Sequence, residues 1–329
     1  METSDDCLIG NAHKVLIKNE RVYISDFSKA MALFVFDLNG KFIFKISKRG
    51  QGPGEYISFR DFDVNSKGDI FMFDLFGKKI LTFNSEGKSL GEFSFTYNFE
   101  SFFVAEDRIY LSSLWGVGGE KISALSVYDI SSGQTTHLLD DAKFLYDIPT
   151  RNSTYYFYQS PSNVYLSPIF SEIIYSINGD TAIPVIKIKN LPLPPDGIIK
   201  NWINENNYDK RIELIRNSNY FLENVSIYET LGYISFDYKG TKTGKILLFN
   251  KRTKTTCVLL PSAYFMELGC STIMGSTGKE FFSAFFIDSK NQFHKKILDS
   301  REELKNWDEE DNPVLVFFNL DMDSPSPFN

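Results

Sequence analysis

Short apolar runs of about six residues recur along the whole chain, and glycine-containing turns separate many of them. In the first two repeats, one run ends in aspartate, a second run follows, and an Asn-Gly or Glu-Gly turn comes next. The glycine supplies the positive φ angle that a tight hairpin needs. Six pairs of runs follow this pattern: residues 21–26 with 32–37, 69–74 with 79–84, 108–113 with 125–129, 163–167 with 173–177, 233–237 with 245–249, and 280–286 with 314–320.

The spacing of these pairs predicts the fold. Their period of roughly 40 to 60 residues matches a four-stranded antiparallel blade better than the rung of a solenoid. We therefore expect an all-β protein, a six-bladed β-propeller that forms a single domain over residues 1–329.

Two stretches interrupt the pattern and read as helical insertions on the propeller. Residues 189–219 open with a proline-rich segment, after which Ile198 and Trp202 are four positions apart, so we expect a short amphipathic helix with Asp196 as its N-cap. Residues 288–312 also carry apolar side chains at helical spacing, namely Phe293, Ile297, Leu304 and Trp307.

Composition supports a β protein and argues against two classes of partner. Aromatic residues make up 16% of the chain, and such side chains suit the half-buried surface of a sheet. The net charge of −7 argues against a nucleic-acid binder, and no apolar run is long enough to span a bilayer. Acidic residues follow Met1, where a signal peptide would carry positive charge. The three cysteines make no disulfide framework, and we expect a monomer.

Residues 49–56 read RGQGPGEY and follow the first repeat directly. In this segment, in the run Leu8–Gly10 and in Asn312-Pro313, the chain resembles the bacterial NHL-like (TolB-like) six-bladed β-propellers of Bacteroidetes, in which G-x-G-P-G-E-Y links consecutive blades. The resemblance implies a cell-envelope location, periplasmic or lipid-anchored, with the export signal absent from this sequence. The residues themselves indicate that Gly50, Gly52 and Gly54 serve a tight chain path, not phosphate binding.

No catalytic, metal or cofactor motif is found. Residues 50–54 have the wrong spacing for a dinucleotide fingerprint, and 240–245 is one residue short of a P-loop. The histidines His13, His137 and His294 lack the spacing of zinc ligands. We therefore expect a non-catalytic binding or interaction propeller whose partner is a glycan, peptide or protein. The alternative is a metal-assisted lactonase-like or esterase-like hydrolase that uses the central channel, by analogy of fold alone.

The order of strands in a blade predicts where a ligand would bind. The loop between the second and third strands opens on the same face as the connection to the next blade, and both insertions extend from that face. Aromatic and arginine side chains at a concave mouth suit a ligand site. The candidates on this face are Arg60, Phe76, Trp115, Trp202, Tyr238 and Trp307. We expect Trp115 nearest the channel, whereas Trp202 and Trp307 have the alternative role of anchoring their helices.

The sixth blade is expected to close poorly. Two prolines follow Leu320, which makes a further strand at the C-terminal end unfavourable. We expect that only a few residues of 1–7 pair with this blade and that the native precursor has more chain upstream.

Overall fold

In a computed structural model, the chain is described over residues 1–96, 99–112, 123–139, 156–160, 163–168, 171–220, 224–239, 244–259, 272–288, 290–304 and 306–320. It divides into two compact units, which we describe separately. Unit 1 comprises Met1–Phe95, Tyr228–Ile234 and Leu248–Asn329, and unit 2 comprises Thr96–Ile227 and Ser235–Leu247.

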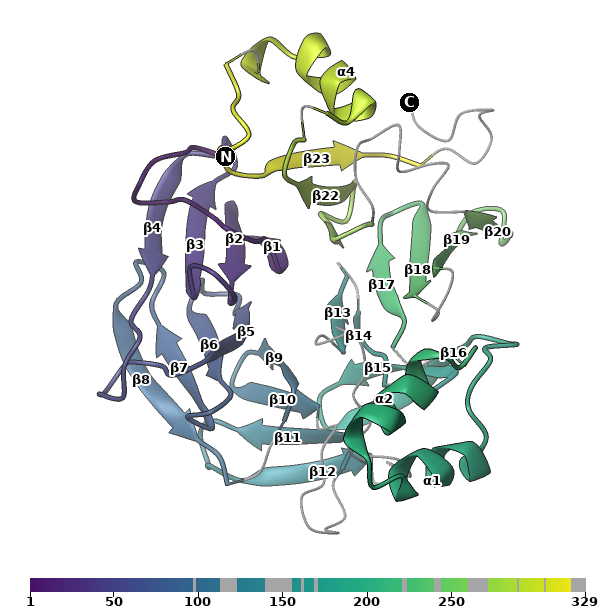
Figure 1. Cartoon of the computed structure of the whole chain (residues 1–329). Helices are drawn as coiled ribbons and strands as arrows, with labels where there is room; N and C mark the ends of the chain where they lie inside the picture. Colours follow the sequence, from purple (N-terminus) through teal and green to yellow (C-terminus); the bar gives the residue numbers. More distant parts are fainter. Residues whose placement is uncertain are drawn as a thin grey trace. The chain divides into compact units, whose positions relative to one another are not determined.

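Successive groups of strands form antiparallel sheets, each strand pairing with its neighbours in sequence (Figure 1). The first three sheets are β1 (Lys14–Lys18), β2 (Arg21–Asp26), β3 (Ala32–Asp37) and β4 (Phe42–Ile46); β5 (Phe59–Val64), β6 (Ile70–Asp74), β7 (Lys79–Phe83) and β8 (Ser89–Ser94); and β9 (Ser101–Ala105), β10 (Arg108–Ser112), β11 (Leu125–Asp129) and β12 (Thr135–Leu139).

The remaining three sheets continue the series. They are β13 (Phe157–Gln159), β14 (Val164–Leu166), β15 (Ile173–Asn178) and β16 (Thr181–Lys187); β17 (Ser226–Glu229), β18 (Tyr233–Lys239), β19 (Gly244–Asn250) and β20 (Thr256–Leu259); and β21 (Gly275–Ser276), β22 (Phe281–Phe285) and β23 (Val314–Phe318). These sheets are the six blades of a β-propeller, as the repeats predict.

The helices occur where the pattern of apolar runs breaks. Helices α1 (Asp196–Asn204) and α2 (Tyr208–Arg216) lie between β16 and β17, and α4 (Gln292–Ser300) with the 3₁₀ turn η1 (Glu302–Leu304) lies between β22 and β23. The N-cap of α1 is Pro195, not Asp196 as expected. The carboxylate of Asp196 instead lies in the first turn, where the helix dipole favours a negative charge.

Burial follows the order of strands within a blade. In the first blade every residue of β2 except Arg21 is buried, whereas the outer strand β4 alternates between partly exposed and exposed positions up to its last residue, Ile46, which is buried. Tyr23, Val35, Phe62 and Met72 belong to one apolar cluster that joins the first two blades of unit 1. The middle strands of these blades are covered on both faces, which is why their sequences are continuous apolar runs and not alternating ones.

The sixth sheet contains three strands within the described residues, and residues 1–7 form no strand. The N-terminal segment is held by Asn312, whose side chain is 1% exposed. Its Nδ2 donates to the carbonyls of Glu2 at 2.6 Å and Cys7 at 2.8 Å, and its Oδ1 accepts from the N–H of Ile9 at 2.7 Å. Asn312 thus ties the N-terminal segment down beside an apolar cluster in which Phe282 of the sixth blade packs with Val22 and Phe34 of the first. The expected poor closure of the sixth blade stays a prediction, because residues 260–271 and 321–329 lie outside the described part of the chain.

No helix in the described part of the chain has the length and hydropathy that a membrane span requires.

Candidate functional site

Three loops of unit 1 meet at the end where the inner strands β1 and β5 begin. Phe27, in the loop between β2 and β3, packs edge-on against Phe59 with ring centroids 6.4 Å apart. Tyr56 donates from its hydroxyl to the Met31 carbonyl in the same loop, and burial raises the pKa of Tyr56 to about 12, so it remains a donor. The Leu75 N–H, after β6, donates to the Ser58 carbonyl at 3.0 Å. We call residues 8–13, 26–31, 47–60 and 74–78 the loop face of unit 1.

Two buried aspartates fix the geometry of this face. Asp26 ends β2, and its carboxylate accepts backbone N–H groups both from the incoming segment, at Gly10 and Asn11, and from its own loop, at Ser28 and Lys29. Burial opposes ionisation, but these backbone donors prevail and lower the pKa of Asp26. The anionic carboxylate therefore acts as a hub that holds two loops together.

Asp74 repeats this arrangement in the second blade. It ends β6 and accepts from the N–H groups of Ile57 at 2.9 Å, Ser58 at 2.9 Å and Gly77 at 3.1 Å. Both aspartates are 0% exposed. The sequence interpretation missed this role, although the signal was present: each aspartate closes the first apolar run of its repeat.

The glycine-rich segment is also structural in this face. A Cβ on Gly50 would lie 1.9 Å from Oε2 of Glu55, and the Gly52 N–H donates to that same oxygen at 2.9 Å. Gly54 has a φ of +73°, a conformation that favours glycine. The Glu55 carboxylate thus occupies the space beside Gly50 and accepts the Gly52 N–H within the same turn. This contact supports the interpretation that the glycines serve the chain path.

Arg60 is the residue of this face that is best placed to meet a ligand. The pairing of β5 with β6 shifts between Phe59 and Asp61, so Arg60 is the extra residue of a β-bulge. Its guanidinium carbon lies 5.5 Å from the ring centroid of Phe27. Its Nε is buried and makes no hydrogen bond to any described residue. Bulges redirect side chains and are frequent next to binding sites. The bulge thus gives Arg60 a side-chain direction that the regular strand would not, while its Nε bonds to none of the described residues.

His13 completes the cluster around Phe27. The two rings stack with centroids 3.8 Å apart and an interplanar angle of 27°. The Nδ1 atom of His13 lies 3.9 Å from Oδ1 of Asp26 and has no hydrogen-bond partner within the described residues. Burial lowers the pKa of His13 from its ordinary value of 6.5, against the opposing effect of the Asp26 carboxylate. We therefore expect a neutral imidazole at pH 7.

This pKa gives a testable pH dependence. Because the folded pKa of His13 lies below the unfolded value, the unfolded state binds more protons within that window. The contribution of His13 to stability is thus complete above pH 6.5 and is lost as the pH falls through the folded pKa. We expect His13→Gln to reduce the loss of stability between pH 7.5 and pH 5, as measured by urea unfolding at about five pH values.

The matched control is His137→Gln, because His137 lies on the outer strand β12, where its side chain is exposed. This variant should retain the pH profile of the unaltered protein. Identical profiles for the two variants would show that His13 does not cause the pH dependence.

Below this cluster, an ion pair joins the inner strands. Lys14 of β1 donates to Oδ1 of Asp61 at 2.8 Å and to the Phe62 carbonyl at 2.6 Å. The Asp61 side chain is fully buried, and burial raises its pKa even though Lys14 acts in the opposite direction. This pair is part of the contact between the first two blades. Among the described residues, no three histidine, cysteine, aspartate or glutamate side chains lie close enough together to hold a metal ion.

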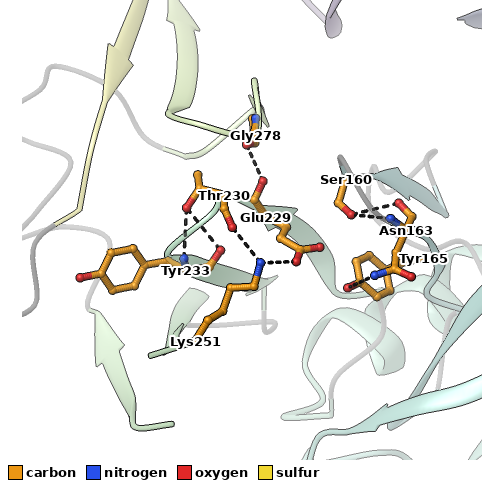
Figure 2. Close-up of polar contacts among 9 residues, drawn as sticks. Ser160, Asn163, Tyr165, Glu229, Thr230, Tyr233, Lys251 and Gly278 are labelled. Atoms are coloured by element: carbon orange, nitrogen blue, oxygen red, sulfur yellow. Dashed lines mark hydrogen bonds and ion pairs between the residues drawn. The ribbon is translucent and has the colours of Figure 1, made fainter. Parts of the chain in front are cut away.

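A second polar cluster of unit 1 lies at the turns that follow β17 and β19, at the end of the blade opposite to the loop face (Figure 2). Lys251 donates to Oε1 of Glu229 at 2.5 Å and to the Thr230 carbonyl at 3.0 Å. Ser276 of the sixth blade donates to the Glu229 carbonyl at 2.6 Å. These contacts tie two hairpin turns and two blades to one another, so we assign this cluster to stability.

The structure places the predicted site residues in different surroundings. Phe76 is 72% exposed on the loop face that also carries Arg60. Trp307, also in unit 1, follows η1, and its Nε1 is buried with no hydrogen bond to a described residue. Trp202, in unit 2, is 4% exposed and packs between α1 and α2 with Ile215. Such packing matches the helix-anchoring alternative.

The other two candidates are not tested. Tyr238 lies on β18, but its side chain is outside the described part of the structure, and Trp115 lies outside the described residues altogether. Their roles, and a shared face for the three tryptophans, stay predictions.

Comparisons with known proteins agree with this fold. The family model for a domain of unknown function, DUF4934, matches residues 1–319. A solved structure of a candidate exported protein from Bacteroides fragilis is 20% identical, with a TM-score of 0.80 over 96% of this chain and 92% of that chain. A DUF4221 family member from Bacteroides vulgatus is 11% identical, with a TM-score of 0.57 over 95% and 93% of the two chains. At these identities the likeness concerns the fold alone. No curated protein matches significantly.

Proposed function

This chain belongs to the DUF4934 family, a domain of unknown function, and from its own residues we propose that it is a non-catalytic binding propeller that meets its partner at the loop face of unit 1. The observation that carries the proposal is Arg60. Its position in a β-bulge, the placement of its guanidinium over Phe27, and a buried Nε that bonds to none of the described residues favour a role in recognition. An arginine that served packing alone would have no reason to leave a buried donor unused.

Exposed apolar side chains beside Arg60 support the same proposal. Phe76 is 72% exposed and Ile57 is 41% exposed. Ile57 precedes Ser58 and Phe76 follows Leu75. Because the Leu75 N–H donates to the Ser58 carbonyl, the two exposed residues lie on adjacent segments at one edge of the face. Apolar side chains next to an arginine are typical of the energetically important part of an interface.

A cell-envelope location is part of the proposal. It is supported by the resemblance to NHL-like propellers of Bacteroidetes and by the description of the Bacteroides fragilis protein as a candidate exported protein. The partner would then be a glycan, peptide or protein outside the cytoplasm.

A paired-variant screen tests the site. The unaltered protein and an Arg60→Gln/Phe76→Ser variant are applied to a glycan array and to a peptide array. We expect the double substitution to weaken every specific signal by roughly tenfold or more, which corresponds to about 1.4 kcal/mol.

The control variant is Arg21→Gln/Leu38→Ser, which changes the same kinds of side chain in the first blade, at the end opposite to the loop face. Arg21 also lies over a phenylalanine ring, at 5.9 Å from the centroid of Phe44, and Leu38 is 56% exposed. If the array signals persist in Arg60→Gln/Phe76→Ser but disappear in this control variant, the proposed site is wrong.

A further inference from the structure

We propose that the partner of the loop face is an acidic peptide segment, bound with its carboxylates against Arg60 and the neighbouring lysines and with an apolar side chain against Phe76. This inference rests on the proposed function and names the chemistry of its ligand.

The first argument is the balance of free charge on this face. Its cations, Lys29, Lys48, Arg49 and Lys78, are exposed, and none forms an ion pair with a described residue. Its acids, in contrast, are all occupied by the backbone: Asp26, Asp74 and Glu55 accept N–H groups of the loops themselves. A protein with a net charge of −7 thus presents a locally cationic surface.

The second argument locates that surface more closely. The acidic run 308–311 directly precedes Asn312, which binds the N-terminal residues around Asp5 and Asp6. These exposed acids therefore lie at the sixth-blade side of the first blade. The cationic part is the segment 47–60 together with 75–78, which belong to the second blade.

The third argument is the geometry of Arg60. The two Nη groups of a guanidinium can donate to both oxygens of a carboxylate. In Arg60 the Nε is buried and makes no hydrogen bond to a described residue, so a carboxylate would meet the guanidinium at its Nη groups. The guanidinium carbon lies 5.5 Å from the ring centroid of Phe27, and this contact limits the movement of the side chain, which reduces the entropy lost on binding. We therefore expect Arg60 to bind a carboxylate of the partner.

The fourth argument favours a peptide over a sugar. The ring of Phe27 is stacked with His13 and contacted by Arg60, so it is not available to a ligand. The exposed large apolar side chains of this face are Leu8, Ile57 and Phe76, and the cations flank the last two. Cations around exposed aliphatic and aromatic groups complement a peptide that alternates acidic and apolar side chains.

Three labelled probes test this inference by fluorescence anisotropy with the full chain. The first is a peptide of alternating glutamate or aspartate with phenylalanine and leucine, the second is its glutamine and asparagine counterpart, and the third is an oligogalacturonate. We expect the acidic peptide to bind at least ~10-fold more tightly than the amide peptide and to weaken as salt rises from 50 to 200 mM.

Charge-matched variants localise the binding. Arg60→Gln, and separately the triple variant Lys48→Gln/Arg49→Gln/Lys78→Gln, should each weaken acidic-peptide binding by ~10-fold or more. A control triple removes the same charge from exposed lysines at the opposite end of the blades, Lys41→Gln/Lys67→Gln/Lys88→Gln, and should leave binding within about twofold.

The outcomes separate the two proposals. If oligogalacturonate binds through Arg60 and the acidic peptide does not, the peptide inference is wrong while the loop face keeps its proposed function. The same holds if only uncharged probes bind and Arg60→Gln/Phe76→Ser weakens them. If the control triple weakens binding as much as the loop-face triple, the recognition is non-specific charge attraction and both proposals are overturned.

Discussion

Replacing Asp26 with alanine should lower the free energy of unfolding by about 3 to 5 kcal/mol, an effect seen for few single substitutions. The carboxylate is 0% exposed and accepts four backbone N–H groups, those of Gly10, Asn11, Ser28 and Lys29. Removal of the acceptor leaves these donors without a partner, and water can restore only the outermost of them. The midpoint of guanidinium unfolding measures the loss, and Asp74→Ala should behave similarly.

Asp37→Ala is the matched control. Asp37 also accepts two backbone N–H groups of its turn, from Asn39 and Lys41, but those contacts are exposed. Water replaces the lost acceptor there, so we expect a change of at most about 1 kcal/mol. Equal losses for Asp26→Ala and Asp37→Ala would contradict the assignment of Asp26 as a buried hub.

Replacing Asn312 with alanine should cost about 2 to 4 kcal/mol and should also release the N-terminal segment. Its side chain makes hydrogen bonds to the backbone of Glu2, Cys7 and Ile9, and these contacts hold residues 1–9 against the sixth blade. Hydrogen exchange of backbone amides 2–9 should therefore accelerate more than exchange in the second blade.

Two further variants make this result specific. Asn312→Asp keeps the acceptor for Ile9 but places a buried carboxylate oxygen against the carbonyl oxygens of Glu2 and Cys7, so we expect a loss at least as large as for Asn312→Ala. Asn207→Ala removes the N-cap of α2, which should cost roughly 1 kcal/mol without changing exchange at residues 2–9. Unchanged exchange in Asn312→Ala would falsify the role of this residue in holding the N-terminal segment.

The candidate site stays a prediction. The order of strands within a blade assigned Arg60 and Phe76 to one face, and in the structure the guanidinium of Arg60 lies over the ring of Phe27. His13 had been considered only as a zinc ligand, and Asp26 and Asp74 had been read as ends of strands. A carboxylate that binds backbone N–H groups leaves no motif in the sequence, because its partners contribute no side chain to the pattern.

The blades and the insertions follow from the sequence by itself. Apolar runs, glycine turns and helical spacing act over fewer than about ten residues, so local periodicity and turn chemistry determine them. They predicted six blades, and helices α1, α2 and α4 lie in the two expected insertions.

Only the tertiary structure decided which side chains meet. Asn312 bonds to Ile9 across 303 positions of the chain, and the bulge that aims Arg60 exists only because β5 pairs out of register with β6. Such contacts depend on how the strands pair and how one blade packs against the next. The same apolar pattern is compatible with several registers, and single hydrogen bonds or one-residue shifts determine which register forms. For this reason the sequence determines the fold of this protein, whereas the surroundings of the Arg60 guanidinium over Phe27 appear only after its blades are assembled.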